Sequence, residues 1–549
     1  MRSALCLLAI AALAAAEDPK PARLERPVPA WLTTAVVYQI YPQSFADHDG
    51  DGIGDLQGII DHLDYVKSLG ATAIWLNPIY ASPFRDAGYD ISDYRQVAPR
   101  YGTNDDARQL FAEAHRRGLK VILDLVAGHC ASDHAWFREA CASAQSPHAD
   151  WFIWSDEAHG HGWVKSPGPR PGFYRKNFFD SQPALNYGYG TPDPRNPWER
   201  PVTDPACRQV REAMRDVMRF WLDQGCDGFR VDMAASLVKG QGKALQELWH
   251  DYRTWMKAAY PDAVLISEWS QPVEAIPAGF DVDFLIHFGN PAYRALVQPT
   301  MAKTYPDQAF CSRAGNGDIT AFLKAWQPAY EATRHLGFIA LPTGNHDFSR
   351  PRSLGRDEDD LRVLHALLLT LPGVPFVYYG DEIGMRDLHG WPEKEGAMWR
   401  GSCRSPMQWG PGPTAGFSTA DPARLYLPID PDPQRPTVAA QEGDPASLLH
   451  HLRDLLRLRR DHDALGNLGG FAVLHAQPKD YPFVFLRQGA REAVVVAVNP
   501  SGRDRSWRDG RLAGATPLMV RHATLEGDQL HLGPASYAIL SVRPTTGVP

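Results

Sequence analysis

Residues 208–232 read RQVREAMRDVMRFWLDQGCDGFRVD and join the two patterns that decide the fold. Residues 208–223 place apolar side chains three or four positions apart, which is typical of an amphipathic helix. Gly228–Asp232 (GFRVD) then forms a short apolar run that ends in a carboxylate, and such a run indicates a buried strand. The stretch therefore predicts one helix followed by one strand of a parallel sheet.

The same alternation recurs along most of the chain, and a second amphipathic stretch covers residues 105–117 (DDARQLFAEAHRR). Eight apolar runs are predicted as strands: Val36–Tyr41, Ala73–Asn77, Val121–Val126, Gly228–Asp232, Val264–Glu268, Asp283–His287, Phe338–Leu341 and Val374–Tyr379. Eight strands separated by helices predict an α/β fold, a closed (β/α)₈ TIM barrel. An open doubly wound sheet is the alternative, and the lack of a GxGxxG turn after the first strand weakens it.

Two segments depart from the alternation. Residues 130–205 are rich in Trp, His, Gly and Pro and are too long for a plain loop, which predicts an inserted domain after the third strand. The barrel is then expected to cover residues 31–129 and 206–447. A helix at 448–465 is expected to connect it to residues 466–549, whose alternating strands and turns predict a C-terminal all-β domain, a β-sandwich.

The first residues have the pattern of a targeting signal. Arg2 precedes the apolar run Ala4–Leu13, and the small residues at 14–16 form a cleavage site, so residues 1–16 are predicted as a signal peptide. A buried N-terminal helix is the alternative. Residues 17–30 are Pro-rich and are expected to be a leader. No later apolar stretch is long enough for a membrane span, so we expect export to the periplasm or the medium.

Composition limits the class of partner. The 549 residues hold 56 Lys and Arg against 64 Asp and Glu, and a net charge of −8 argues against nucleic acid. Aromatic residues reach 11%, which fits a large core or a surface that stacks on ring-shaped ligands. The six cysteines beyond Cys6 form no CxxC zinc pair and are expected to be structural. We expect a monomer.

Polar side chains end several of the predicted strands: Asp124, His129, Arg230, Asp232, Glu268, His346 and Asp347. The carboxyl ends of the strands of a (β/α)₈ barrel meet at one rim, where its active sites form. Four carboxylates, two histidines and an arginine at one rim indicate an active site. No GxSxG or HExxH motif competes with them.

Paired carboxylates at this rim favour glycoside chemistry. One carboxylate must stay ionised to attack the anomeric carbon, and the other must stay protonated to release the leaving oxygen. Arg230 lies two residues before Asp232 on the same face of a strand, so we expect its charge to lower the pKa of Asp232. Trp269 follows Glu268, and we expect desolvation by its ring to raise the pKa of Glu268.

Four strings carry a resemblance to a known family. DLVAGH (124–129), GFRVDM (228–233), ISEW (266–269) and GNHD (344–347) resemble, in order, the four signature regions of the α-amylase family, glycoside hydrolase family 13. QPALN (182–186) and GDEIGM (380–385) are similar to its fifth and seventh regions. The resemblance runs from roughly residue 36 to residue 410. It implies that the insertion is the family's domain B and that the β tail is its C-terminal domain.

The resemblance also implies roles. Asp232 would be the nucleophile, Glu268 the general acid/base, and Asp347 the third carboxylate, which stabilises the transition state. Arg230 would orient Asp232. The implied substrate-binding residues are Asp86, Tyr89, His129, Arg230, His346 and Arg404, with Tyr89 as the platform on which the sugar stacks. The reaction would retain anomeric configuration through a covalent glycosyl-enzyme.

RSPMQW (404–409) resembles the RTPMQW string of the oligo-1,6-glucosidase, α-glucosidase and sucrose-isomerase branch. That branch implies an exo-acting α-glucosidase of malto- or isomalto-oligosaccharides, with an α-glucan or oligosaccharide as partner. An endo-acting α-amylase and a transglycosylase, such as a sucrose isomerase or trehalose synthase, remain alternatives. A catalytically inactive binding module is weakened by the three carboxylates. The chain departs from the family at Gly128, Ala184 and Met233.

Residues 47–58 (DHDGDGIGDLQG) have the spacing of an EF-hand-like loop. They supply carboxylates at positions 1, 3, 5 and 9 and a carbonyl at position 7: Asp47, Asp49, Asp51, Asp55 and Ile53. Gly58 stands where a full EF-hand has a bidentate Glu. Four carboxylates this close would repel one another without a cation, so the loop predicts a structural Ca²⁺.

Overall fold

The computed structural model describes residues 19–240, 242–286, 291–297, 308–391 and 393–543. The predicted signal peptide, residues 1–16, lies outside the described residues. His287, at the end of one predicted strand, and the last residues of the predicted C-terminal domain, 544–549, also lie outside them.

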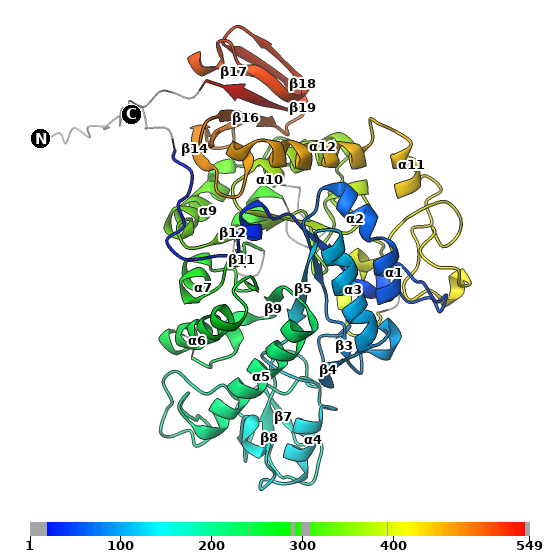
Figure 1. The fold of residues 1–549 in the computed structure, drawn as a ribbon, viewed down its shortest axis with the longest axis vertical. Helices are drawn as coiled ribbons and strands as arrows, with labels where there is room; N and C mark the ends of the chain where they lie inside the picture. Colours follow the sequence, from blue (N-terminus) through cyan, green and yellow to red (C-terminus); the bar gives the residue numbers. More distant parts are fainter. Residues whose placement is uncertain (1–18, 241, 287–290, 298–307, 392, 544–549) are drawn as a thin grey trace, which may run out of the picture.

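Eight parallel strands close into a barrel, in the order β1-β13-β12-β11-β10-β9-β5-β2 (Figure 1). They are β1 Val37–Ile40, β2 Ala73–Leu76, β5 Lys120–Leu125, β9 Gly228–Val231, β10 Val264–Ser267, β11 Val282–Phe284, β12 Phe338–Pro342 and β13 Val374–Tyr378. Each strand lies inside one of the eight predicted apolar runs or extends one residue beyond it. The predicted (β/α)₈ fold is confirmed.

Helices follow the strands and form the outer layer, which covers their outward faces. They are α1 Leu56–Asp61, α2 Leu63–Leu69, α3 Asn104–Arg116, α5 Pro205–Gln224, α6 Lys243–Ala259, α7 Pro272–Ala278, α8 Pro291–Leu296, α9 Ile319–Thr333 and α10 Glu358–Thr370. The helix of the opening stretch, α5, ends at Gly225, whose left-handed φ of 111° stops it, and strand β9 begins three residues later.

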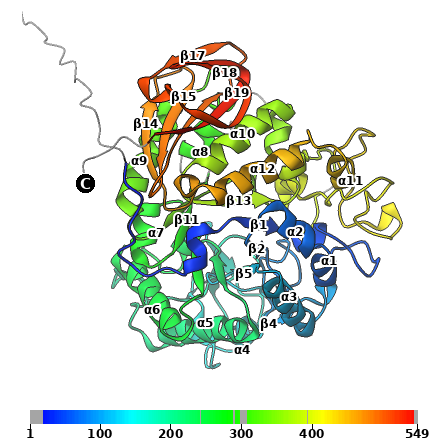
Figure 2. The same cartoon turned by 45° about the horizontal axis from the view of Figure 1, so that its top comes forward.

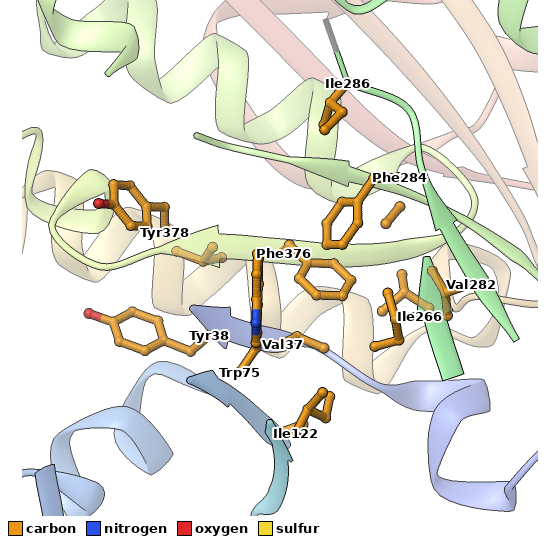
Figure 3. Packing of buried hydrophobic residues seen from close by; sticks show 14 of the residues in the cluster. Val37, Tyr38, Trp75, Ile122, Ile266, Val282, Phe284, Ile286, Phe376 and Tyr378 are labelled. Atoms are coloured by element: carbon orange, nitrogen blue, oxygen red, sulfur yellow. The ribbon is translucent and has the colours of Figure 1, made fainter. Parts of the chain in front are cut away.

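Aromatic side chains fill the barrel interior below the rim (Figure 3). The rings of Phe284 and Phe376 lie 4.6 Å apart, and Trp75 lies 5.6 Å from Phe284. Trp75 also reaches the rim, because its indole N–H donates to Asp124 Oδ2 at 3.2 Å. The packed interior thus gives the polar side chains above it a rigid floor.

The inserted segment is a small domain of its own between β5 and α5, at the bottom of Figure 1. It holds α4 Ala135–Ala142 and a three-stranded antiparallel sheet of β6 Trp154–Ser155, β8 Phe173–Arg175 and β7 Trp163–Lys165, in that order. Aromatic packing among Phe137, Phe152 and Tyr174 forms its core. Another small sheet has two strands, β3 Tyr80–Ala81 and β4 Asp93–Val97. These strands flank the loop that holds Asp86 and Tyr89.

The C-terminal domain is all-β, as predicted, and its described strands form one hydrogen-bonded sheet. They are β14 Gly470–His475, β15 Phe483–Gln488, β16 Ala493–Asn499, β17 Arg505–Arg508, β18 Thr516–Glu526 and β19 Gln529–Val542. The first part of β19 pairs with β17 and the last part with β16. The sheet bends between these parts, so Leu530 and Leu540 meet in one buried cluster.

The helix predicted as a connector, α12 Leu448–Asp461, is also the last helix of the barrel layer. It packs between α2 and α10, and Figure 2 shows it beside the strand β13. Its side chains Leu452 and Leu456 border the same small void as Val37 and Val377 of the barrel strands. The helix that follows the eighth strand therefore completes the ring, and only residues 462–469 connect the two domains.

The described part of the predicted leader is tied to the surface rather than free. Ala22 N donates to the carbonyl of Leu468 at 2.6 Å, and Arg253 Nη2 donates to the carbonyl of Pro27 at 2.6 Å. The segment thus runs from the C-terminal domain along the barrel to α6 (Figure 1). Among the described residues, no helix combines the length and apolarity that a membrane span requires.

We expect Leu452→Ala to destabilise the whole barrel, because Leu452 is fully buried in α12. The expected loss is about 2–5 kcal/mol, measured by urea unfolding followed through tryptophan fluorescence. Arg457→Ala on the same helix, whose side chain is 62% exposed, is the matched control and should change stability by less than about 0.5 kcal/mol. Equal effects of the two substitutions would mean that α12 is a peripheral connector.

Candidate active site

A cavity of about 490 Å³ opens at the carboxyl ends of the barrel strands. This volume lies within the usual range for small-molecule sites. Seven residues singled out from the sequence line it: Asp86, Tyr89, His129, Asp232, Glu268, His346 and Asp347. The structure therefore brings together side chains that lie up to 261 positions apart, between Asp86 and Asp347.

Asp232 and Glu268 stand one residue beyond the ends of β9 and β10. The N–H of Asp232 donates to the carbonyl of Leu125, and the N–H of Glu268 donates to the carbonyl of Val231, both at 3.0 Å. These bonds continue the barrel ladder past the strands. They fix the two backbones side by side, so that the carboxyl groups project from a rigid edge.

The guanidinium of Arg230, on β9, links three carboxylates. Its Nη1 donates to Asp124 Oδ1 at 2.9 Å and to Asp232 Oδ1 at 3.1 Å, and its Nη2 lies 2.9 Å from Glu268 Oε2. Arg230 is only 2% exposed and does not line the cavity. It lies behind the paired carboxyl groups and holds both in place, as the sequence analysis expected for Asp232.

Burial raises the pKa of Glu268 to about 7, and Arg230 opposes this shift. The expected direction holds, although the whole enclosed site, and not Trp269 alone, desolvates the carboxyl group. Burial also raises the pKa of Asp232 to about 7, so the expectation that Arg230 would lower it is corrected: Arg230 acts in that direction, but desolvation is larger. The negative charge of Asp232 also raises the pKa of Glu268, so ionisation of the one disfavours ionisation of the other.

The pKa of Asp347 is shifted in the opposite direction from those of Asp232 and Glu268. Burial opposes its ionisation, yet the pKa of Asp347 lies below its ordinary range because the guanidinium groups of Arg400 and Arg404 lie against it. Arg404 Nη2 lies 3.1 Å and Arg400 Nη1 3.4 Å from Asp347 Oδ1. Asp347 is therefore an ionised carboxylate at the cavity wall, and it faces a pair that retains a proton.

Tyr89 and His346 share a closed hydrogen-bond network. Gln39 Nε2 donates to His346 Nδ1 at 2.9 Å, so the neutral ring carries its proton on Nε2, 2.8 Å from the Tyr89 hydroxyl. That hydroxyl also accepts from Asn77 Nδ2 at 2.8 Å and donates to Asp124 Oδ2 at 2.9 Å. Burial lowers the pKa of His346 well below its ordinary value, which keeps the ring neutral. The network locks the Tyr89 ring at the cavity wall.

An ion pair lies in the wall of the cavity. Arg400 Nη2 donates to Asp86 Oδ1 at 2.8 Å, and Gln182 of the inserted domain donates to Asp86 Oδ2 at 2.8 Å. Both Arg400 and Asp86 line the cavity. Arg400 lies on a 3₁₀ helix, η8 Met398–Arg404, that follows β13. The pair therefore joins the loop between β3 and β4 to the segment that follows β13.

His129 is held by both of its ring nitrogens. Nε2 donates to the carbonyl of Tyr89 at 2.9 Å, and Asn177 of the inserted domain donates to Nδ1 at 3.0 Å. Burial lowers the pKa of His129 to about 4, so the ring is neutral. A Cβ atom on Gly128 would lie 2.9 Å from Asn177 Nδ2. The glycine that departs from the family pattern thus leaves the space that Asn177 occupies.

Two positions next to the catalytic pair are strained or braced. Met233 has a φ of 43°, which is rare for a residue with a side chain, and its N–H donates to Glu268 Oε2 at 3.0 Å. Asp283, on β11, accepts hydrogen bonds from Ser267 Oγ at 2.6 Å and from Trp269 N at 3.1 Å. Asp283 therefore braces the turn that presents Glu268.

Arg400, Asn177 and Asp283 were not predicted from the sequence as site residues. Arg400 lies four residues before Arg404, the arginine selected from RSPMQW, and only the 3₁₀ turn reveals which of the two faces the cavity. Arg404 is 1% exposed, donates through Nε to the carbonyl of His346 at 2.7 Å, and does not line this cavity. The Arg404 guanidinium contacts Asp347 without lining the cavity itself.

The acidic loop offers part of the predicted cation site. One carboxylate oxygen each of Asp47, Asp49 and Asp55 lies within 4.8 Å of the others, as three ligands of one Ca²⁺ would. Asp51 is outside this group, and its Oδ1 accepts from Ile53 N at 2.7 Å. Burial raises the pKa of Asp55 although it accepts three backbone hydrogen bonds. Asp55 is the N-cap of α1, so a cation there would touch the first barrel helix.

Residues 39–467 match the family model for the alpha-amylase catalytic domain. The chain belongs to the α-amylase family. This match spans the barrel, the inserted domain and α12, and it confirms the family that the four signature strings indicated. The enzyme is accordingly an O-glycosyl hydrolase of the α-glucosidase/amylase type.

Relatives in the family have several names. Trehalose synthase/amylase TreS of Mycobacterium tuberculosis (strain CDC 1551 / Oshkosh) is 34% identical over 530 residues, which cover 86% of this chain and 82% of the relative. Glucan 1,6-alpha-glucosidase of Streptococcus dysgalactiae subsp. equisimilis is 32% identical and covers 89% and 95%. The crystal structure of trehalulose synthase MutB from Pseudomonas mesoacidophila MX-45 has a TM-score of 0.79 at 28% identity and covers 94% and 100%.

We expect Glu268→Gln to stabilise the protein at high pH only. The raised pKa of Glu268, about 7 against an ordinary 4.5, means that the folded state binds more protons than the unfolded state between these values. Stability therefore falls as the pH rises through this window, and a neutral amide avoids that loss. The variant should match the wild type at pH 5 and exceed it at pH 8 by on the order of 1–3 kcal/mol.

Urea unfolding at both pH values measures this difference, with Glu247→Gln on the exposed face of α6 as the control. Destabilisation of Glu268→Gln at pH 8 would show that the ion pair with Arg230 outweighs the desolvation of Glu268.

Proposed function

We propose that this α-amylase-family enzyme is a retaining, exo-acting α-glucosidase of malto- or isomalto-oligosaccharides. The observation that carries the proposal is the single guanidinium of Arg230, which contacts both Asp232 and Glu268 in an enclosed cavity. Retaining glycosidases need two adjacent carboxyl groups with one proton between them. The shared arginine and the raised pKa values supply this arrangement near neutral pH.

In the first step, Asp232 attacks the anomeric carbon while Glu268 gives its proton to the departing glycosidic oxygen. The bond between carbon and oxygen breaks, and a glucosyl ester forms on Asp232. In the second step, Glu268 takes a proton from water, the water oxygen attacks the anomeric carbon, and Asp232 leaves. Asp347 stays ionised throughout and stabilises the positive charge that develops on the sugar ring.

The ion pair of Asp86 and Arg400 supports exo action. It spans the cavity wall, and both groups are aimed at the space that a glucosyl ring would fill. A chain that continued past this point would have to break the pair. The enclosed end therefore suits the terminal, non-reducing glucose, whose hydroxyl groups can bond to the carboxylate and the guanidinium.

A transglycosylase is the second candidate, and the names of the relatives favour it. Three of the matched relatives are named trehalose synthase/amylase, and a matched solved structure is named isomaltulose synthase. Such enzymes use the same covalent intermediate and differ in whether a sugar hydroxyl or water resolves it. Product analysis separates the two candidates.

We expect the purified protein to release glucose from maltohexaose one unit at a time, and the glucose should appear first as the α-anomer. Proton NMR follows the anomeric signals directly. Asp232→Asn should lower kcat at least about 10³-fold, because the nucleophile is lost while folding is retained. Asp216→Asn, an exposed carboxylate on α5, is the control and should remain fully active.

Mixed short oligosaccharides at early times would contradict exo action and favour an endo-amylase. Isomerised disaccharides from maltose or sucrose, with little free glucose, would favour the transglycosylase. Release of the β-anomer would contradict the retaining mechanism itself.

We also propose that the loop from Asp47 to Asp55 holds a structural Ca²⁺. The three clustered carboxylates and the acidic spacing support it. Bound Ca²⁺ would neutralise their repulsion and fix the connection between β1 and α1. The loop also contacts the segment after η8, because Ser418 Oγ donates to Asp47.

We expect Ca²⁺ to raise the melting temperature of the chelator-treated protein, and Asp49→Ala to abolish this increase. Asp49 is the exposed member of the cluster, so its loss should cost little in packing. At a hundredfold excess over Kd, one bound ion contributes about 2.7 kcal/mol. Calorimetry measures the shift, and isothermal titration measures binding. If neither Ca²⁺ nor the chelator changes the melting temperature of the wild type, the proposed Ca²⁺ site is wrong.

Export and a monomeric state remain part of the proposal. The apolar run after Arg2 supports export, and mass spectrometry of the mature N-terminus tests it, with Glu17 as the expected first residue. The six cysteines that the structure describes are all buried, which agrees with a structural role for their side chains.

A further inference from the structure

An amide of the inserted domain lies behind the wall of the catalytic cavity. Asn177 is half-buried and does not line the cavity, yet its Nδ2 contacts three residues that do. It donates to His129 Nδ1 at 3.0 Å and to Ser236 Oγ at 3.4 Å, and it lies 3.9 Å from Met233 Sδ. Asn177 therefore links the loop after β5 to the 3₁₀ turn after β9, η5 Ala234–Ser236.

The polarity of the contact with His129 follows from the opposite side of the imidazole ring. Nε2 lies 2.9 Å from the backbone carbonyl of Tyr89, and a carbonyl oxygen only accepts, so Nε2 carries a proton. Burial lowers the pKa of His129 to about 4, and the charge of Lys239 adds to this effect, so the ring is neutral. A neutral imidazole has one N–H, so Nδ1 must accept. The atom of Asn177 that faces Nδ1 is therefore its amide nitrogen.

His129 in turn holds one end of Tyr89. The hydroxyl group of Tyr89 is fixed by Asp124 and His346, whereas its backbone carbonyl accepts from His129 Nε2. A rotation of the His129 ring would remove this donor from the carbonyl. The amide of Asn177 thus acts through His129 on an aromatic side chain that lines the cavity.

A closed turn of the inserted domain holds Asn177 in place. Its N–H donates to the carbonyl of Gln182 at 2.9 Å, and the N–H of Gln182 donates to the carbonyl of Phe179 at 2.9 Å. The N–H of Phe179 donates to Gln182 Oε1 at 2.8 Å. Gln182 Nε2 also donates to Asp86. Residues 177–182 therefore support the cavity wall at two points, once through each end of the turn.

Space for the amide depends on Gly128, the residue before His129. A Cβ atom at this position would lie 2.9 Å from Asn177 Nδ2 and 3.0 Å from Ser236 Oγ, closer than ordinary van der Waals contact. A side chain at position 128 would therefore displace the amide from His129. The glycine and the amide are two parts of one arrangement, although they lie 49 positions apart in the chain.

We propose that Asn177 is a positioning residue that, together with the space at Gly128, fixes the tautomer and the orientation of His129 in the catalytic cavity. The inference rests on the proposed function and deepens it, because it gives a residue outside the cavity lining a role in glucosyl transfer. The inserted domain then takes part in aligning the cavity wall for the reaction.

Asn177→Asp tests the direction of the hydrogen bond, because it keeps the shape of the side chain and removes both N–H donors. A carboxylate only accepts, so His129 Nδ1 takes up a proton and the ring becomes an imidazolium. We expect kcat/KM for maltose to fall about 10- to 100-fold in Asn177→Asp and in Asn177→Ala. Asn196, another half-buried amide of the inserted domain, donates to Glu199 and does not line the cavity. Asn196→Ala is the matched control and should stay fully active.

Ring ¹⁵N NMR of histidine-labelled protein gives a readout that a merely structural role would not move. The signals of His129 are identified by their loss in His129→Gln. In the wild type they should show Nε2 protonated and Nδ1 unprotonated, without change between pH 6 and pH 8, because the pKa of His129 lies at about 4. In Asn177→Asp both nitrogens should be protonated at pH 7.

Gly128→Ala removes the same contact from the other side. The φ of Gly128 lies outside the left-handed region, so alanine fits its backbone, and only the crowding at Asn177 Nδ2 and Ser236 Oγ opposes the substitution. Gly128→Ala should lower kcat/KM as Asn177→Ala does, and the double variant should be no worse than either single variant. Additive losses would mean that the two positions act independently.

Full activity and an unchanged His129 signal in Asn177→Asp would overturn the positioning role and leave the proposed function intact. If Asn177→Asp does not fold in urea-unfolding controls, Asn177→Ala and Gly128→Ala make the same comparison. If the wild type cleaves no α-glucoside, the proposed function fails, whereas the NMR signals of His129 still decide whether Asn177 sets its tautomer.

Discussion

The charge of Arg230 constrains the whole catalytic face. A guanidinium that is 2% exposed requires anionic partners, and Asp124, Asp232 and Glu268 supply them from three different strands or strand ends. These carboxylates would in turn be unstable as anions in an enclosed site without that cation. The result is a group of buried charges whose members fix one another, in which burial raises the pKa values of Asp232 and Glu268.

The barrel makes the group possible because parallel strands end together. Extending β9 and β10 by one residue places Asp232 and Glu268 side by side, and the aromatic packing of Trp75, Phe284 and Phe376 supports the layer beneath them. Elements outside the barrel then shape the cavity. The inserted domain contributes Asn177 and Gln182, and η8 contributes Arg400. The strand ends thus supply the paired carboxyl groups of Asp232 and Glu268, whereas segments between the strands supply Asn177, Gln182 and Arg400 around them.

This division bears on the proposed specificity. Under the proposed function, Asp232 at a strand end reacts with the anomeric carbon, while Asp86, Arg400 and Trp399 line the cavity that receives the sugar. Relatives of this chain are named both as a glucosidase and as a trehalose synthase/amylase.

The sequence by itself determined the barrel strands, three of the helices, the insertion and the candidate catalytic carboxylates, because hydrophobic periodicity is local and the signature strings lie at strand ends. It also located the acidic loop, since the carboxylates of that loop lie within nine residues. Only the tertiary structure decided that Arg400 rather than Arg404 faces the cavity, that Asn177 fills the space at Gly128, and that burial outweighs Arg230 at Asp232. It also showed that the C-terminal strands form one bent sheet and that α12 closes the barrel layer. These outcomes depend on contacts between residues far apart in the chain and on how completely water is excluded, and neither is encoded in any local pattern.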